Sequence, residues 1–216
     1  MNNIECVLFD LDGVVLDTEV QYDVFWGNVG KKYKPEIDHF ERVIKGTTLP
    51  NILKNHFENL SETQLKELVN DLDIFEANMD FREIKGSIQF IKTLKASQFK
   101  VGLVTSSMDS KMKAVNNAIH LDLLFDDIVT AAHVKQGKPN PECFLIAAKH
   151  LNVKPESCLV FEDSLAGIDA ATAAGMKVIG LATTLPKEKL EVHGKCQAII
   201  PNFDGMTVDK LLNLLR

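Results

Sequence analysis

The feature that most constrains the fold is an alternation of short apolar runs with segments of helical periodicity along most of the 216-residue chain. Short apolar runs are typical of buried strands, whereas apolar residues at three- and four-residue spacing are typical of helices. We expect strands at residues 4–9, 100–105, 128–131, 157–161, 177–182 and 197–200, and helices at 110–119, 141–151, 164–174 and 208–215. Strands that alternate with helices predict an α/β fold, with a Rossmann-like parallel sheet covered by helices on both faces.

Local signals place some of the helix boundaries. The run Ser61-Glu62-Thr63-Gln64 matches a capping box and predicts a helix start. Asn140 is expected as an N-cap with Pro141 at the first helical position. Gly175 is expected to end the helix at 164–174.

Residues 18–80 interrupt the alternation, because their apolar residues recur only at helical spacing. This stretch follows the first predicted strand directly, and the alternation resumes near Gly86. We therefore expect an inserted all-helical cap domain at residues 18–84. Residues 1–17 and 85–216 are expected to form the α/β core domain.

The composition excludes several classes of function. The formal net charge is −6, and residues 16–84 carry 14 acidic and 8 basic side chains, which disfavours binding to a nucleic-acid backbone. No apolar run approaches the roughly 20 residues that a membrane span requires. The four cysteines are far apart and the first residues do not resemble a secretion signal, so we expect a cytoplasmic protein. Nothing in the sequence requires more than a monomer.

Polar side chains gather where the predicted strands end. They are Asp10 and Asp12 after the first strand, Thr105, Ser106 and Ser107 at the end of the second, Lys138 shortly after the third, and Glu162 and Asp163 after the fourth. Ligands of open parallel sheets bind beyond the carboxyl ends of the strands. We therefore expect these side chains to meet at one rim of the sheet.

The residue types at this rim suit phosphate chemistry. Asp10 and Asp12 should point the same way, because side chains alternate along an extended segment. Neighbouring carboxylates repel unless a cation lies between them, and hard oxygen ligands favour Mg²⁺. Thr105 and Ser106 can bind phosphate oxygens, and Lys138 can balance the remaining charge. Phosphoryl transfer depends chiefly on such positioning and neutralisation, and a carboxylate can serve as its nucleophile.

Each of these residues also has a simpler interpretation when it is taken alone. An aspartate after a strand often forms a turn or caps a helix, and Lys138 can be a surface lysine. Other motifs fail on spacing: residues 10–13 lack the EF-hand pattern, and residues 137–138 lack the P-loop pattern. The six histidines show no zinc-site spacing. The joint occurrence at four strand ends favours a phosphoryl-transfer site.

Four segments resemble the motifs of the haloacid dehalogenase-like superfamily, in the order in which that family has them. They are Asp10-Leu11-Asp12-Gly13-Val14-Val15, Val104-Thr105-Ser106-Ser107, Gly137-Lys138-Pro139-Asn140-Pro141-Glu142 and Phe161-Glu162-Asp163-Ser164. The resemblance covers essentially the whole chain. Asp17-Thr18-Glu19 and the helical insertion resemble the subgroup that contains β-phosphoglucomutases and small sugar-phosphate phosphatases.

The resemblance implies a Mg²⁺-dependent phosphatase that hydrolyses a small phosphorylated metabolite, such as a sugar phosphate, through an aspartyl-phosphate intermediate. Asp10 would be the nucleophile and a Mg²⁺ ligand. Asp12 would be the general acid/base, with its carbonyl on the metal and a pKa that neighbouring acids raise toward working pH. The other implied roles are phosphate binding by Thr105, Ser106 and Lys138, metal binding by Asp163 and Glu162, and substrate binding by a cap loop at Lys45 and Gly46.

Two positions depart from the β-phosphoglucomutases of this family. Tyr22 aligns with a cap histidine, and Leu49 aligns with a cap arginine that grips a second phosphate. Leucine cannot bind phosphate, so the sequence favours hydrolysis over a hexose-phosphate mutase, although Lys45 or Lys54 can substitute for the arginine. Asp12 argues against a dehalogenase, and the intact motifs argue against a non-catalytic binding protein.

Overall fold

A six-stranded parallel sheet forms the centre of the protein in the computed structural model, which describes residues 4–45 and 49–215. The strands lie in the order β3-β2-β1-β4-β5-β6, and every neighbouring pair is parallel. Their bounds are β1 Cys6–Phe9, β2 Lys100–Val104, β3 Asp127–Val129, β4 Cys158–Glu162, β5 Lys177–Leu181 and β6 Ala198–Ile200. The predicted α/β fold is confirmed.

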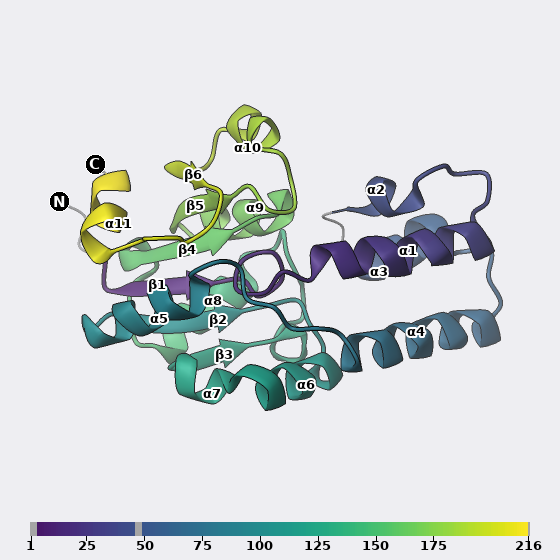
Figure 1. The fold of residues 1–216 in the computed structure, drawn as a ribbon, viewed down its shortest axis with the longest axis horizontal. Helices are drawn as coiled ribbons and strands as arrows, with labels where there is room; N and C mark the ends of the chain where they lie inside the picture. The colour runs from purple at the N-terminus through teal and green to yellow at the C-terminus, as the bar shows by residue number, and fades with distance from the viewer. Residues whose placement is uncertain (1–3, 46–48, 216) are drawn as a thin grey trace.

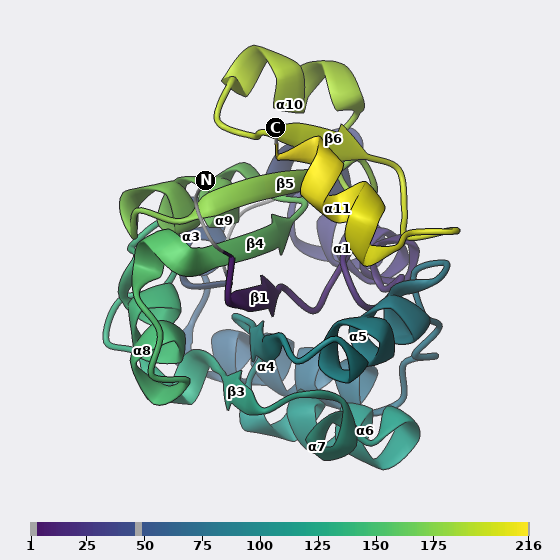
Figure 2. The ribbon, with the colours of Figure 1, turned by 90° about the vertical axis from the view of Figure 1, so that its left-hand side faces the viewer.

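Helices cover both faces of the sheet, as Figure 2 shows. One face packs against α5 (Ser87–Ala96), α6 (Asp109–Ile119), α7 (Leu121–Leu124) and α11 (Val208–Leu214), and the other against α8 (Glu142–His150), α9 (Leu165–Ala173) and α10 (Lys187–His193). Side chains of β1 alternate between the faces: Val7 and Phe9 lie in one apolar cluster, and Cys6 and Leu8 lie in the other. Burial on both faces explains why these strands read as continuous apolar runs.

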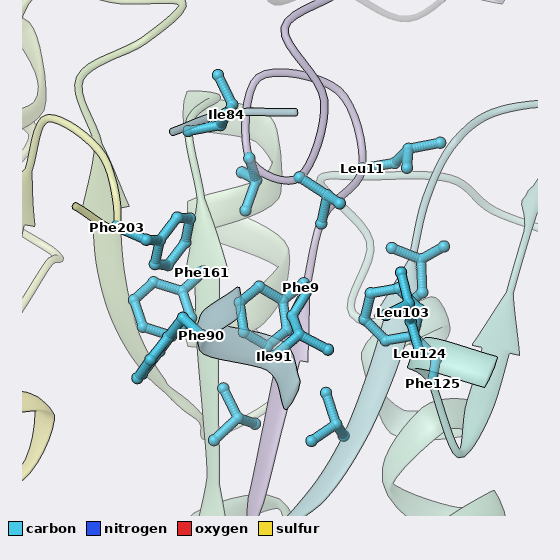
Figure 3. Close-up of a cluster of buried hydrophobic side chains, with 14 of the residues drawn as sticks. Phe9, Leu11, Ile84, Phe90, Ile91, Leu103, Leu124, Phe125, Phe161 and Phe203 are labelled. Carbon is cyan, nitrogen blue, oxygen red and sulfur yellow. The ribbon is translucent and has the colours of Figure 1, made fainter. Parts of the chain in front are cut away.

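Four phenylalanines fix the two central strands where the polar residues begin (Figure 3). Phe9 ends β1 and stacks on Phe161 of β4, with ring centroids 5.0 Å apart. Phe90 and Phe203 stack on each other at 5.7 Å and pack against Phe161 from the helical side. Aromatic pairs of this kind add packing energy beyond the area that they bury. The residues that follow Phe9 and Phe161 therefore project from a rigid base.

Four helices lie to one side of the sheet (Figure 1). They are α1 (Glu19–Tyr33), α2 (Phe40–Ile44), α3 (Leu49–His56) and α4 (Glu62–Ala77), and we refer to them as the helical cap. The cap encloses an apolar cluster of its own around Trp26, Phe40 and Phe57. The capping box at Ser61 is confirmed, because its hydroxyl accepts the Gln64 N–H while Gln64 caps Ser61 in return. The domain boundaries at residues 17/18 and 84/85 stay a prediction, which this separate cluster supports.

The chain crosses between core and cap twice, and the two crossings lie side by side. The Asp17 N–H donates to the Arg82 carbonyl at 2.8 Å, and the Ile84 N–H donates to the Val15 carbonyl at 2.9 Å. Leu16 and Glu83 form an antiparallel bridge between these bonds. We refer to residues 15–17 and 82–84 as the crossing ribbon.

Several predicted boundaries shift by a few residues. The strand expected at 128–131 ends at Val129, and residues Ala131–His133 form a 3₁₀ turn, which the Thr130 hydroxyl caps by accepting from the Ala132 N–H. Asn140 Oδ1 accepts from the Glu142 N–H as expected of an N-cap, but the helix begins at Glu142 and Pro141 occupies the N-cap position. Helices α5, α7 and α10 were not among those expected. Within the described ranges, no helix is long and apolar enough to cross a membrane.

Candidate active site

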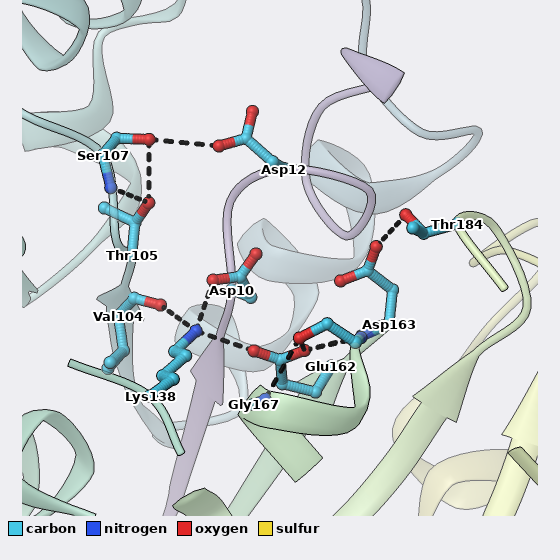
Figure 4. A network of polar contacts seen from close by, with 11 residues as sticks. Asp10, Asp12, Val104, Thr105, Ser107, Lys138, Glu162, Asp163, Gly167 and Thr184 are labelled. Carbon is cyan, nitrogen blue, oxygen red and sulfur yellow. Dashed lines mark hydrogen bonds and ion pairs between the residues drawn. The ribbon is translucent and has the colours of Figure 1, made fainter. Parts of the chain in front are cut away.

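The polar residues predicted at the strand ends lie together beyond the carboxyl ends of β1, β2 and β4 (Figure 4). Asp10 follows Phe9, and its backbone N–H donates to the Phe161 carbonyl at 3.0 Å. This bond continues the pairing of β1 with β4 by one residue. The sheet therefore sets the position of Asp10 and of the acidic pair that ends β4.

Lys138 fixes the Asp10 carboxylate through a hydrogen bond. Its ammonium donates to Asp10 Oδ1 at 2.6 Å, to Glu162 Oε1 at 2.7 Å and to the Val104 carbonyl at 3.2 Å. All three protons of this buried ammonium are used. Burial lowers the pKa of Lys138, but Asp10 and Glu162 outweigh that effect and raise it. Lys138 is therefore a fixed positive charge beside Asp10.

The Asp10 carboxyl is buried and surrounded by other acids. Burial raises its pKa to about 7, together with Glu162 and Asp12, although Lys138 opposes the rise. Of the two Asp10 carboxylate oxygens, Oδ1 accepts a hydrogen bond from Lys138, and no described side chain donates to Oδ2. Oδ2 is therefore available to a ligand. An additional cation would favour the ionised form that a nucleophile needs.

Both oxygens of the Glu162 carboxylate already accept hydrogen bonds from protein groups. Its Oε2 accepts from the backbone N–H groups of Asp163 and Ser164, both at 2.9 Å, and from the Ser164 hydroxyl at 3.0 Å. The carboxylate fills the space beside Gly167, where a Cβ atom would lie 1.7 Å from Oε1. The arrangement makes Glu162 a support for Lys138 and does not support a direct role as a metal ligand.

Asp163 faces the opposite side of the site and contacts the loop after β1. Thr184 donates a hydrogen bond to its Oδ2, and a Cβ atom on Gly13 would overlap the same oxygen. Gly13 also has a φ of +74°, so both the space and the backbone require glycine there. Burial raises the pKa of Asp163 well above its ordinary value, with Glu162 and Asp10 adding to the rise.

The donor chemistry of the site fits Mg²⁺. Four carboxylates (Asp10, Asp12, Glu162 and Asp163) face only two buried ammonium groups, those of Lys138 and Lys111. The excess of two negative charges matches one divalent cation, and the donors are hard oxygens. In the part of the chain that the structure describes, no three acidic, histidine or cysteine groups already converge as a ligand cluster. Asp10 and Asp163 are the carboxylates that remain for a metal.

Asp12 turns away from Lys138 toward helix α6 and the cap. Its Oδ1 accepts from the Lys111 ammonium and from the Thr18 hydroxyl, both at 2.5 Å, and its Oδ2 accepts from the Ser107 hydroxyl at 3.1 Å. Burial raises the pKa of Asp12, but Lys111 and these hydroxyls outweigh burial and lower it. The expectation that neighbouring acids raise this pKa is wrong, because a buried lysine lies closer.

The three hydroxyl residues after β2, Thr105, Ser106 and Ser107, have different surroundings. The Thr105 hydroxyl is buried and accepts from the Ser107 N–H at 3.0 Å. Ser107 in turn binds Asp12, whereas Ser106 is exposed. The predicted role of Thr105 and Ser106 in phosphate binding stays a prediction, and Ser107 gains a role as support for Asp12.

The cap residues singled out from the sequence have different surroundings. Lys45 donates to both carboxylate oxygens of Asp23, at 2.9 and 3.0 Å, and lies 3.4 Å from Glu19. Gly46 lies outside the described residues. Leu49 packs against the apolar cluster of the cap, which is no position for a phosphate ligand.

Lys111 is the residue of this site that sequence reasoning missed. It is fully buried on α6, next to Met112 and four residues before Val115, which are both buried. A lysine on the apolar face of an amphipathic helix is the signal that could have revealed it.

Comparison with known proteins agrees with this geometry. The family model described as haloacid dehalogenase-like hydrolase matches residues 7–181, and the chain belongs to this family. The predicted membership of the haloacid dehalogenase-like superfamily is confirmed, and so is the prediction of a phosphoric monoester hydrolase.

Three relatives illustrate the similarity. The chain is 29% identical to a phosphorylated carbohydrates phosphatase of Thermotoga maritima, with 99% of each chain covered. A HAD hydrolase of family IA, variant 3, from Entamoeba histolytica superposes with a TM-score of 0.83 at 25% identity, over 98% of this chain and 99% of that one. The β-phosphoglucomutase of Clostridium difficile superposes with a TM-score of 0.80 at 28% identity, over 98% and 97%.

Proposed function

We propose that this protein is a Mg²⁺-dependent phosphatase of a small phosphorylated metabolite, with sugar phosphates as the substrate class. The observation that carries the proposal is the Asp10 carboxylate at the end of β1, held by the buried Lys138 and flanked by Asp12 and Asp163. Similarity to a phosphatase of phosphorylated carbohydrates over 99% of the chain supports this substrate class.

In the first step, Asp10 attacks the phosphorus through Oδ2 and the bond to the leaving oxygen breaks, which gives an aspartyl phosphate. The negative charge of the bound phosphate opposes the effect of Lys111 on the pKa of Asp12, so Asp12 takes up a proton from solvent in the complex and passes it to the leaving oxygen. In the second step, the Asp12 carboxylate takes a proton from water, whose oxygen attacks the phosphorus and restores Asp10. Lys138 keeps the Asp10 carboxylate oriented throughout, because Glu162 and the Val104 carbonyl fix the ammonium.

Asp10 and Asp163, together with the Asp12 carbonyl, would hold the Mg²⁺ ion. When bound, the ion supplies neutralisation of the phosphate charge. Thr105 and Ser106 would bind the phosphate oxygens, and the loop of Lys45 and Gly46 would contact the remainder of the substrate.

The proposal is tested by phosphate release from a panel of sugar phosphates, with Mg²⁺ and with a chelator. We expect release that needs the metal and that Asp10→Asn lowers by at least about 10³-fold, because the nucleophile is lost. Asp122→Asn changes an exposed aspartate on α7 in the same way and serves as the matched control. Full activity of a folded Asp10→Asn protein would refute the assignment of the nucleophile.

A second candidate is a hexose-phosphate mutase, because a β-phosphoglucomutase superposes on almost the whole chain. The position of Leu49 against the cap cluster favours the phosphatase, since a bisphosphate intermediate needs a grip on its second phosphate. Turnover of hexose 1-phosphate to hexose 6-phosphate, stimulated by a sugar bisphosphate, would identify the mutase.

The remaining expectations concern the state of the protein in the cell. The reaction proposed above requires no residue from a second copy of the chain, so we propose a monomer. The described cysteines are free, which suits a reducing cytoplasm.

A further inference from the structure

Lys111 differs from the other lysines because its side chain is fully buried and lies between the core and the cap. An unpaired buried ammonium is costly, so its position depends on its partners. They are Asp12 Oδ1 at 2.5 Å and the Tyr22 hydroxyl at 2.7 Å. The ammonium also lies 4.8 Å from the centre of the Tyr22 ring.

The chain of contacts continues into the cap. Tyr22 lies on α1 and donates its hydroxyl proton to Glu76 Oε1 of α4 at 2.6 Å. Hydrogen bonds of 2.5 to 2.7 Å therefore link four side chains in series: Asp12, Lys111, Tyr22 and Glu76. We refer to this series as the Lys111 relay.

Two further contacts show that Asp12 is linked to the cap more closely than Asp10 is. Thr18, the residue before α1, donates to the same Asp12 oxygen as Lys111 does. Ser110, beside Lys111, donates to Asp73 of α4 at 3.2 Å. Asp10, by contrast, is held by Lys138, whose three partners all belong to the sheet side of the protein.

We propose that Lys111 is a positioning residue that makes the orientation of the Asp12 carboxyl group depend on the position of the cap. With the cap placed as here, Tyr22 and Glu76 fix the ammonium, and the ammonium fixes Asp12. Displacement of α1 and α4 removes two of the groups that define this geometry. The inference rests on the proposed function, since it is there that Asp12 transfers protons.

The test separates proton transfer by Asp12 from the reaction of Asp10. A sugar phosphate needs a proton on its leaving oxygen, whereas p-nitrophenolate leaves without one. Lys111→Met is therefore expected to lower kcat for the sugar phosphate on the order of 100-fold with little change in KM, a loss in the range of general acid–base catalysis. The initial burst of p-nitrophenol, which reports aspartyl-phosphate formation, should fall less than about threefold.

Three further variants define the origin of the effect. Tyr22→Phe keeps the ring and removes one oxygen, so it should lower sugar-phosphate turnover in the same direction, by about tenfold, and it carries the test if Lys111→Met does not fold. Lys111→Arg should restore part of the lost turnover. Lys113→Met changes an exposed lysine on the same helix and should behave as wild type.

Hydrogen exchange of the substrate-free protein gives a readout without activity. Amides at the start of α1 and the end of α4 should exchange faster in Lys111→Met than in Lys113→Met. Equal losses on both substrates, undiminished sugar-phosphate turnover, or unchanged exchange would each overturn the role of Lys111. A wild-type protein that releases phosphate from no substrate would instead refute the proposed function, while the exchange experiment would still judge the relay.

Discussion

Replacing Gly167 by alanine is expected to damage the active site from within helix α9. The added Cβ atom would lie 1.7 Å from Glu162 Oε1 and 1.9 Å from Cδ, distances that real contacts do not reach. Glu162 must therefore move by more than about 1 Å to reach ordinary van der Waals contact. It would then leave Lys138 and the N–H groups of Asp163 and Ser164.

The magnitude follows from the interactions that Glu162 makes. Breaking a buried ion pair costs about 3–5 kcal/mol, because the remaining charge stays buried without its partner. We therefore expect Gly167→Ala to lower the free energy of unfolding by about 3–5 kcal/mol and to disturb phosphate release through Lys138. Gly27 of α1 is the matched helical control, since its Cβ atom would meet the Glu41 side chain at ordinary contact distance, with Oε2 at 3.4 Å and Cδ at 3.9 Å. Gly27→Ala should stabilise the protein by up to about 1 kcal/mol.

Urea unfolding followed by two signals tests this expectation. The single tryptophan, Trp26, lies in the cap, so its fluorescence reports the cap, whereas far-UV circular dichroism reports the helices of both parts. Gly167→Ala should shift the circular dichroism transition to lower urea. A loss below about 1 kcal/mol would refute the claim that Glu162 is rigidly held, because it would mean that the carboxylate relocates at little cost.

Three other expectations concern charge. Because burial raises the pKa of Asp10 from 3.8 to about 7, the folded metal-free protein binds a proton that the unfolded chain has released, so its stability should fall as pH rises from about 4 to 7. Mg²⁺ should therefore raise the melting temperature more at pH 8 than at pH 5, and an equal rise at both would contradict the assignment of Asp10 as a ligand. Lys138→Met should lower phosphate release by at least about 100-fold, whereas Lys135→Met, at an exposed position, should not; comparable rates for the two would argue against Lys138. Lys45→Met should raise KM for sugar phosphates with a smaller effect on p-nitrophenyl phosphate, and an unchanged KM in steady-state kinetics would exclude Lys45 from substrate binding.

The sequence predicted the parts of the site that depend on the sheet. Asp10, Thr105, Lys138 and Asp163 lie where strand ends place them, because the carboxyl ends of parallel strands meet at one edge. The same rule could not reveal the contacts of Glu162, which depend on Gly167 in the first turn of α9, five residues further along the chain. Nor did the apolar run at residues 128–131 give the correct end of β3. The strand stops at Val129, and the 3₁₀ turn Ala131–His133 begins inside that run.

Contacts between core and cap were beyond local patterns. Lys111 lies 99 residues from Asp12 and 89 from Tyr22, and their approach depends on how α6 packs against α1 and α4. The error in the direction of the Asp12 pKa shift has the same origin, because acids adjacent in the sequence were counted while a distant lysine was not. Tyr22 was recognised only as a departure from a family pattern, without its partner Glu76.

The crossing ribbon has a mechanical consequence. Two separate linkers would let the cap twist, slide and tilt independently, but residues 15–17 and 82–84 are hydrogen-bonded to each other as a two-stranded strip. Such a strip resists shear within its plane and bends most easily across it. We therefore expect the cap to move relative to the core mainly by bending of this strip, that is, by rotation about a single axis. A disulfide between cap and core that fixed this rotation would therefore be sufficient to control the access of substrate to the sheet edge.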